Sequence, residues 1–299
     1  MRSHDPVPTP VFRFAPSPNG FLHLGHAYSA LMNERLAAAA NGRLLLRFED
    51  LDRIRSRAQY ESAIEEDLLW LGLRFAGPPR RQSEHGADYA AALRRLSAER
   101  LIYPCFCSRS EVARKAERRD PDGAPVYSGA CRSLSAADAR ARTAQGERAA
   151  NRLDMSRALE IVTARLEWTE YGEGSIASQR AAEPALWGDV ALSGRDGAAS
   201  YHLAATTDDA LQGVTDVVRG RDLLAATSIH RLLQELLGFP APRYRHHRLV
   251  LAPDGAKLSK SRLSPSLADV RGKGVAASEI RAALGFGPGA KGGLAVILS

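Results

Sequence analysis

The sequence has few cysteines, few lysines and no long apolar run. Three cysteines in 299 residues are too few, and odd in number, for a disulfide framework, which fits a reducing cytosol. No stretch of about 18 uncharged apolar residues is present, so we expect no transmembrane helix and no membrane partner. The first residues, Met1–Phe12, lack the apolar core of a secretory signal, so we expect a cytoplasmic protein.

The composition is that of a folded and basic protein. Hydrophobic residues make up 44% of the chain, which is enough for a packed core and excludes a disordered or fibrous protein. Lysine and arginine outnumber aspartate and glutamate by 41 to 34, giving a formal charge of +7. This balance indicates either a polyanionic partner such as nucleic acid or only an arginine-rich, soluble surface.

The five lysines are informative because the chain otherwise uses arginine as its cation. Two of them, Lys257 and Lys260, lie in the short serine-containing segment Lys257–Ser261. A lysine is a compact point charge on a flexible stem, which suits a crowded phosphate better than the planar guanidinium does. Taken alone, such a segment is usually a solvated surface loop.

The first part of the chain alternates strands and helices. The apolar segments Val11–Phe14 and Leu44–Phe48 predict buried strands, and His23–Ala40 predicts a helix between them. A second helix is indicated by apolar residues spaced three and four apart from Ile64 onward. This order predicts an α/β protein with a doubly wound, parallel, Rossmann-like sheet.

The middle of the chain differs in composition from the first part, and we interpret it as an insertion between two halves of the sheet. Strands are expected in Leu159–Trp168, in Asp189–Leu203 with a turn at Arg195–Gly197, and within Leu203–Val218, and a helix is expected over Leu223–Leu237. The predicted parts are residues 1–103 and 200–249 for the two halves of the nucleotide-binding domain, 104–199 for the insertion, and 250–299 for the lysine loop and a short helical segment.

A histidine pair follows the turn after the first predicted strand. His23 and His26, in His23-Leu24-Gly25-His26, share one face of a first helical turn, where backbone N–H groups and the helix dipole favour anions. Both imidazoles can donate hydrogen bonds to a phosphate whose charge grows in a transition state. Two alternatives stay open: an ordinary structural pair, or metal ligation, for which no third ligand is nearby.

The histidine pair and the lysine loop together resemble the two defining motifs of class I aminoacyl-tRNA synthetases. The segments Arg13–Gly20, Arg47–Asp52 and Asp208–Gly220 resemble the glutamyl branch, and the resemblance covers nearly the whole chain. It implies that the protein binds ATP with Mg²⁺. The residues implied to bind ATP are His23, His26, Lys257 and Lys260, and the implied catalytic residues among them are His23, His26 and Lys260.

Glutamate as substrate fits the charges of the chain. An amino acid with two carboxylates needs cations at both ends and an anion for its ammonium group. Arg13 ends the first predicted strand and Glu49 follows the second, so both can face the crevice at the carboxyl edge of the sheet. The family resemblance places six residues around the amino acid: Arg13, Ala15, Ser17, Glu49, Tyr201 and Arg219. Any one of them could instead belong to a surface charge or a buried ion pair.

The cysteines cluster in one short window. Cys105, Cys107 and Cys131 supply three soft ligands for a tetrahedral Zn²⁺ and leave one position open. In the truncated members of the glutamyl branch a tyrosine fills that position, which corresponds to Tyr127 here. We expect one structural zinc ion, because the segment lies outside the phosphate motifs and brings no catalytic acid. The alternative is three buried, reduced thiols.

The length after the lysine loop separates two kinds of glutamyl enzyme. Only 38 residues follow Ser261, whereas an independent anticodon-binding domain needs roughly 50 or more. The chain therefore resembles the truncated paralogues, the glutamyl-Q tRNA(Asp) synthetases. This resemblance implies activation of L-glutamate by ATP as glutamyl-adenylate and transfer to queuosine in the anticodon of tRNA(Asp), by a monomer. The alternatives are a short glutamyl-tRNA synthetase that charges the tRNA 3′ end and a non-catalytic glutamate or tRNA binder.

Overall fold

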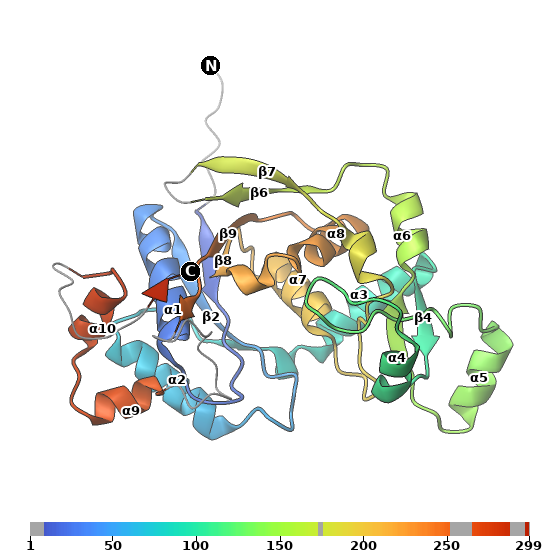
Figure 1. Ribbon diagram of the computed structural model, residues 1–299, viewed down its shortest axis with the longest axis horizontal. Helices are drawn as coiled ribbons and strands as arrows, with labels where there is room; N and C mark the ends of the chain where they lie inside the picture. The colour runs from blue at the N-terminus through green and yellow to red at the C-terminus, as the bar shows by residue number, and fades with distance from the viewer. Residues whose placement is uncertain (1–8, 173–175, 252–264, 288–296, 299) are drawn as a thin grey trace, which may run out of the picture.

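The computed structural model describes residues 9–172, 176–251, 265–287 and 297–298, and its elements form an α/β protein (Figure 1). The described strands are β1 (Val11–Phe14), β2 (Arg43–Phe48), β3 (Arg80–Arg81), β4 (Ile102–Cys105), β5 (Ala150–Leu153), β6 (Glu167–Tyr171), β7 (Ala177–Ala181), β8 (Asp216–Gly220), β9 (Arg243–His247), β10 (Val250–Leu251) and β11 (Ile297–Leu298). The described α-helices are α1 (Leu24–Ala39), α2 (Ala58–Trp70), α3 (Gly86–Ala98), α4 (Arg109–Lys115), α5 (Ala136–Ala144), α6 (Met155–Ile161), α7 (Tyr201–Leu211), α8 (Thr227–Leu237), α9 (Leu267–Gly272) and α10 (Ala277–Ala283). None of the helices in these ranges is long and apolar enough to cross a bilayer.

A seven-stranded sheet carries the fold, in the order β3-β2-β1-β8-β9-β6-β7. Every neighbouring pair in it is parallel except β6 and β7, which confirms the predicted parallel, Rossmann-like sheet. Strand β1 lies between β2 and β8, with Phe14 opposite Leu46 and Phe12 opposite Asp216. Because parallel strands end at the same edge, the segments that follow β1, β2 and β8 meet there.

Side chains alternate between the two faces of this sheet. Phe12, Phe14 and Phe48 pack into a core with residues of α1, α2, α9 and α10. Val11 and Leu45 face the other way, and Arg13 and Arg47 share that face, where they contact Asp209 of α7. Helices therefore cover both faces, as the doubly wound arrangement requires, and the second face carries buried charge next to its apolar residues.

Two predicted strands are present only at the ends of their predicted ranges. The range Leu159–Trp168 is helical up to Ile161, and β6 begins only at Glu167. The range from Tyr201 to Leu211 is helix α7, so the strand expected within Leu203–Val218 is β8, which begins at Asp216. Both helices begin at N-cap side chains, Asp154 for α6 and Ser200 for α7, which accept hydrogen bonds from backbone N–H groups three residues on. These local caps outweigh the strand-like pattern of the apolar residues.

The range 104–199 contributes to two separate places in the molecule. Strand β5 pairs with β4 in a small antiparallel sheet, and α4 and α5 lie near it at one end of the molecule, opposite α9 and α10 (Figure 1). Strands β6 and β7 instead extend the main sheet, because β6 pairs with β9. The predicted turn is present between Ser193 and Ala199, which form a single antiparallel bridge rather than two strands. The predicted helical segment near the C-terminus is present as α9 and α10.

Candidate active site

The histidine pair forms the start of helix α1. His23 is the N-cap residue, and its Nδ1 accepts a hydrogen bond from the backbone N–H of Gly25 at 3.1 Å. The Nδ1 of His26 accepts from the backbone N–H of His23 at 3.2 Å, and the two ring centroids are 3.9 Å apart. An imidazole that accepts at Nδ1 is neutral and carries its hydrogen on Nε2. The capping arrangement therefore sets both rings as Nε2–H donors at an anion-favouring helix end.

Gly25 is required by the position of the His23 ring. A Cβ atom at this residue would lie 2.9 Å from Cε1 and 3.1 Å from Nδ1 of His23. Both distances are shorter than ordinary van der Waals contact. Glycine therefore lets the ring fold back onto the first turn of α1, which explains physically why this residue type stands between the two histidines.

Lys257 and Lys260 lie outside the described residues. The chain that follows them returns to the histidine pair: Ser266 forms an antiparallel bridge with His23, and the backbone N–H of Leu267 donates to the carbonyl of Leu22 at 2.8 Å. Two segments that are distant in the sequence therefore meet at the start of α1.

Four of the six residues expected around glutamate gather at the carboxyl edge of the sheet. Arg13 lies on β1, Glu49 follows β2, Tyr201 opens α7, and Arg219 lies on β8. Burial raises the pKa of Tyr201, and the charges of the other three act on its phenol. The backbone N–H of Glu49 donates to the carbonyl of Pro16 at 3.1 Å, which ties the end of β2 to the loop after β1. That loop contains the other two predicted residues, Ala15 and Ser17, both partly buried.

Arg219 is a buried cation with neutral contacts. Its side chain donates to the Tyr201 hydroxyl at 3.0 Å and to Thr227 Oγ1 at 2.8 Å. Its other partners are the Leu223 carbonyl, His230 Nδ1 and His246 Nε2. No carboxylate among the described residues lies within 4.0 Å of it. A guanidinium in this setting attracts an anion, and the Tyr201 hydroxyl, which accepts from Arg219, keeps its own hydrogen as a donor.

Arg13, in contrast, already has a carboxylate partner. Its Nε donates to Asp209 Oδ1 at 3.0 Å, and Arg47, which is fully buried, donates to the same oxygen at 2.8 Å. Arg47 also lies 3.7 Å from Glu49 Oε1. Burial raises the pKa of Glu49, while the two arginines oppose that effect. Sequence reasoning assigned no role to Arg47 or Asp209, although both stand inside the family-like segments.

Asp208, next to Asp209, ties the same helix to further residues. It accepts hydrogen bonds from Arg80, Gln82 and Tyr89, each at 2.8–2.9 Å. The two adjacent carboxylates of α7 thus connect β1 and β2 with the segment that leads into α3. Because removing one partner of a buried charge leaves the other uncompensated, this network fixes α7, and with it Tyr201, relative to the sheet.

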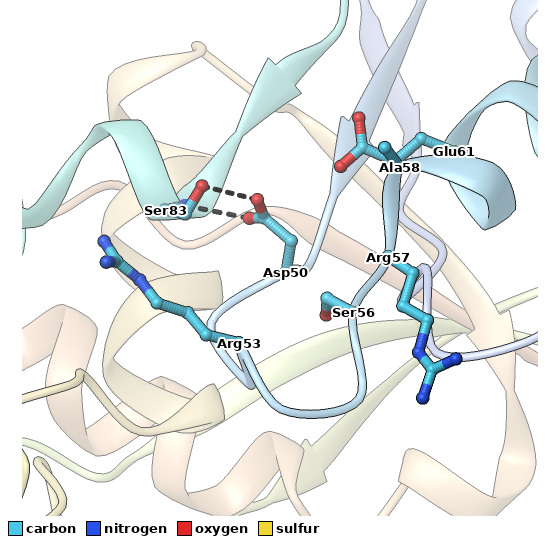
Figure 2. Close-up of a pocket in the computed structure, with 7 residues that line it drawn as sticks. All are labelled: Asp50, Arg53, Ser56, Arg57, Ala58, Glu61 and Ser83. Atoms are coloured by element: carbon cyan, nitrogen blue, oxygen red, sulfur yellow. Dashed lines mark hydrogen bonds between the residues drawn. The ribbon is translucent and has the colours of Figure 1, made fainter.

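An open polar pocket of about 250 Å³ lies along the segment between β2 and α2 (Figure 2). Its lining residues are Asp50, Arg53, Ser56, Arg57, Ala58, Glu61 and Ser83. Asp50 accepts hydrogen bonds from the backbone N–H of Ser83 at 2.8 Å and from its hydroxyl at 2.5 Å, and Glu61 pairs with Arg81 at 2.7 Å. Its carboxylates are therefore already engaged, and no predicted site residue in the described part of the chain lines it.

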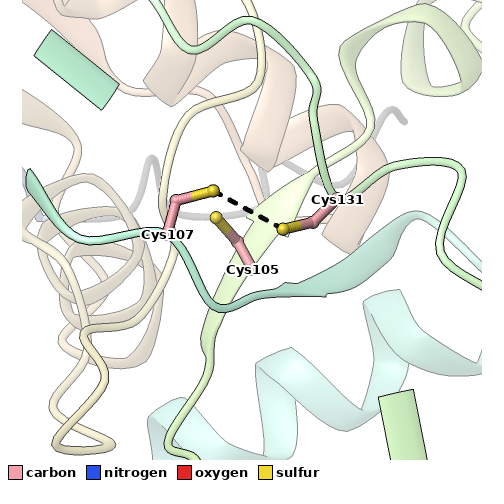
Figure 3. Close-up of side chains that lie close together, drawn as sticks. All are labelled: Cys105, Cys107 and Cys131. Carbon is pink, nitrogen blue, oxygen red and sulfur yellow. Dashed lines mark hydrogen bonds between the residues drawn. The ribbon is translucent and has the colours of Figure 1, made fainter. Parts of the chain in front are cut away.

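The three cysteines converge near the small β4–β5 sheet (Figure 3). The sulfur atoms of Cys105, Cys107 and Cys131 all lie within 4.8 Å of one another, and the last two are 3.6 Å apart. The Tyr127 hydroxyl lies 3.6 Å from Cys107 Sγ. A tetrahedral Zn²⁺ with Zn–S bonds of about 2.3 Å separates its sulfur ligands by about 3.8 Å. The donor set and its spacing therefore fit one metal ion, with Tyr127 in reach of the fourth position.

Comparisons with known proteins agree with this geometry. The family described as class I tRNA synthetases (E and Q), catalytic domain, matches residues 10–287. Glutamyl-Q tRNA(Asp) synthetase of Rhodobacter capsulatus is 41% identical over 289 residues, which cover 92% of this chain and 100% of that protein. Glutamate–tRNA ligase 2 of Nitrosococcus oceani is 41% identical over 271 residues, which cover 88% of this chain and 56% of the ligase.

Solved structures show the same relationship. The crystal structure of a glutamate tRNA ligase from Elizabethkingia meningosepticum, in complex with its amino acid, matches with a TM-score of 0.75 and 26% identity. The match covers 93% of this chain and 60% of that protein. By the extent of these matches, the chain belongs to the class I aminoacyl-tRNA synthetases of the glutamate and glutamine branch, a family of ligases.

Proposed function

We propose that the protein activates L-glutamate with ATP as glutamyl-adenylate and transfers the glutamyl group to queuosine in tRNA(Asp). The observation that carries the first half is the environment of Arg219, a buried guanidinium with no carboxylate within 4.0 Å in the described part of the chain. A substrate carboxylate supplies the missing anion. The Tyr201 hydroxyl donates to that carboxylate while accepting from Arg219, and Glu49 receives the substrate ammonium group. Arg13, Ala15 and Ser17 complete the pocket.

The chemical step needs no nucleophile from the protein. An oxygen of the glutamate α-carboxylate attacks the α-phosphorus of ATP, an O–P bond forms, and the bond to pyrophosphate breaks. The Nε2–H groups of His23 and His26 donate to phosphate oxygens as charge develops on them, and Lys260 supplies a positive charge. Lys257 helps to bind the phosphates, and Mg²⁺ accompanies ATP.

The metal site has a structural role in this proposal. Cys105, Cys107, Cys131 and Tyr127 would hold one Zn²⁺, which would join the segment after β4 to the loop that contains Tyr127. Burial raises the pKa of the Tyr127 phenol, so this side chain ionises only if a metal ion stabilises the phenolate. The division into parts 1–103, 104–199, 200–249 and 250–299, and a monomeric state, belong to the same proposal.

The acceptor is proposed from the relatives. The relatives that are covered over 81–100% of their own length by the match to this chain are named glutamyl-Q tRNA(Asp) synthetases. A hydroxyl of the queuosine cyclopentenediol would attack the glutamyl carbonyl carbon and release AMP. The cis-diol resembles that of a terminal ribose, so one pocket can serve either nucleoside. Relatives named glutamate–tRNA ligase 2 are as similar in identity, which supports charging of the tRNA 3′ end as a second candidate.

A comparison of two tRNAs tests this proposal. The protein is incubated with ATP, radiolabelled glutamate and tRNA(Asp) that either contains queuosine or is an unmodified transcript. We expect an ester-linked glutamate only on the queuosine-containing tRNA, and oxidation of its cis-diol with periodate should prevent the reaction. Glutamylation of the unmodified transcript at its 3′ end would favour the second candidate.

A further inference from the structure

A series of hydrogen bonds between buried side chains of the sheet leads to Arg219. Glu170 of β6 and His246 of β9 are joined twice: Oε2 contacts His246 Nδ1 at 2.8 Å, and Oε1 accepts from the His246 backbone N–H at 2.8 Å. His246 Nε2 then accepts from Arg219 Nε at 3.1 Å. His246 and Arg219 are direct neighbours across β9 and β8. All three side chains are largely buried.

The donors in this series of hydrogen bonds fix where the hydrogens lie. Arginine can only donate, so His246 Nε2 carries a lone pair and Nδ1 carries the hydrogen that it donates to Glu170. Trp168 Nε1 donates to the same oxygen at 2.9 Å, so three N–H groups surround the Glu170 carboxylate. Burial lowers the pKa of His246 to about 4, so the ring is neutral near pH 7. In this arrangement the Glu170 carboxylate orients the His246 imidazole, and the imidazole in turn orients the Arg219 guanidinium.

The arrangement separates Arg219 from its counterion by one side chain. Arg13 has Asp209 in direct contact, whereas Arg219 contacts neutral groups and the Glu170 carboxylate lies beyond His246. The distant carboxylate stabilises the buried guanidinium but occupies none of the space next to Tyr201. Since no carboxylate of the described residues lies within 4.0 Å of Arg219, an incoming carboxylate can approach its positive charge directly.

We propose that Glu170 and His246 are positioning residues that orient Arg219 toward the side-chain carboxylate of glutamate. In this way they favour glutamate over glutamine, whose side chain carries no charge. This inference rests on the proposed function, since it assigns substrate selection to the same site. Neither residue touches the substrate. This relay, from Glu170 through His246 to Arg219, starts on β6, in the range predicted as an insertion. It reaches the site only because β6 pairs with β9.

Glu170→Gln is the decisive variant. The glutamine amide offers one oxygen and one NH₂ group where the carboxylate accepts hydrogen bonds at both oxygens. With its NH₂ group at the Oε2 position, the amide faces His246 Nδ1–H and Trp168 Nε1–H, so His246 must rotate or move its hydrogen to Nε2, and Arg219 loses its acceptor. With the NH₂ group at the Oε1 position, the amide faces the backbone N–H of His246 and is pushed away from it, which loosens the hold on the imidazole. We expect the KM for glutamate in pyrophosphate exchange to rise about tenfold or more. The KM for ATP should not change, and the preference for glutamate over glutamine should fall.

Two controls separate positioning from general stability. Glu167→Gln changes the same strand at a partly exposed pair with Arg165, 2.8 Å apart, and should behave like the parent protein. At the relay itself, His246→Gln places an amide oxygen near the former Nε2 position, whereas the shorter asparagine reaches only the Nδ1 position. We therefore expect His246→Gln to retain more affinity for glutamate than His246→Asn.

The assays are run with tRNA(Asp) present, together with thermal unfolding of each variant. A folded Glu170→Gln variant with the parent KM for glutamate and the parent preference overturns the relay, as does an equal rise in both KM values. If this variant does not fold, equal glutamate KM values for the two His246 variants overturn it. A parent protein without glutamate-dependent exchange refutes the proposed function itself, whereas an active parent with an unaffected variant refutes only the relay.

Discussion

Replacing Gly25 by alanine tests whether His23 must stay where the structure places it. The added Cβ would lie 2.9 Å from Cε1 and 3.1 Å from Nδ1 of His23. Atoms in favourable contact are about 3.5–4.0 Å apart, so the ring must shift by roughly 0.5–1 Å. The shift weakens the 3.1 Å hydrogen bond that Nδ1 accepts from the Gly25 backbone and moves the Nε2–H group away from its phosphate position.

Stability and activity should respond very differently to this change. Loss of a cap costs about 0.5–2 kcal/mol. Alanine in a helix is favoured over glycine by up to about 1 kcal/mol. The two effects largely offset each other, so the free energy of unfolding should change by no more than about 1 kcal/mol, which corresponds to about 2–4 °C in Tm. A misplacement of about 1 Å can lower the rate by about a hundredfold. We therefore expect pyrophosphate exchange to fall by roughly tenfold to a hundredfold.

The assay measures glutamate-dependent exchange of pyrophosphate into ATP, alongside thermal unfolding. Gly86→Ala is the matched control, because Gly86 opens α3 and a Cβ there meets nothing within 4 Å. The control should keep the parent activity. A Gly25→Ala variant that exchanges pyrophosphate at the parent rate would show that the ring position does not matter, and the role proposed for His23 would be wrong.

Four further changes test other parts of the structure. Burial raises the pKa of Asp67 from 3.8 to about 6, so its ionisation opposes folding as the pH rises through that range. Asp67→Asn should therefore stabilise the protein by up to about 3 kcal/mol near pH 8 and by much less near pH 4, and an equal effect in urea unfolding at both pH values would contradict this. Because burial also raises the pKa of Glu49, and an ammonium group needs the carboxylate form, glutamate should bind more tightly in calorimetry as the pH rises above the ordinary range of a carboxyl pKa. Glu49→Gln should bind glutamate weakly throughout the pH series, whereas an unchanged affinity would remove the role of Glu49. Cys131→Ser should lower both the bound zinc, measured by elemental analysis, and the Tm, and an unchanged zinc content would reject the metal site. Lys260→Ala should lose pyrophosphate exchange but still bind glutamate, and parent-level exchange would disprove its role.

Local sequence patterns predicted the parts of the fold that depend on short-range geometry. The apolar segments around Phe12 and Leu45 became β1 and β2, and the helix predicted from His23 to Ala40 is α1 within a residue. Where prediction failed, at α6 and α7, the N-cap residues Asp154 and Ser200 were the signals that could have corrected it. The cysteine window predicted a cluster because three soft ligands close in sequence can converge with little loop closure.

The sequence by itself determined which chemical groups the protein has and where its motifs lie, because a helix cap or a Cys-x-Cys segment depends on neighbouring residues. Only the tertiary structure decided which charges have partners. Arg13 and Arg219 are the same residue type on neighbouring strands, yet Arg13 pairs with Asp209 and Arg219 reaches Glu170 only through His246. Those partners come from α7, β9 and β6, which the strand order brings together over long sequence distances. Partners across a sheet are set by topology and register, and no local pattern in the sequence encodes them.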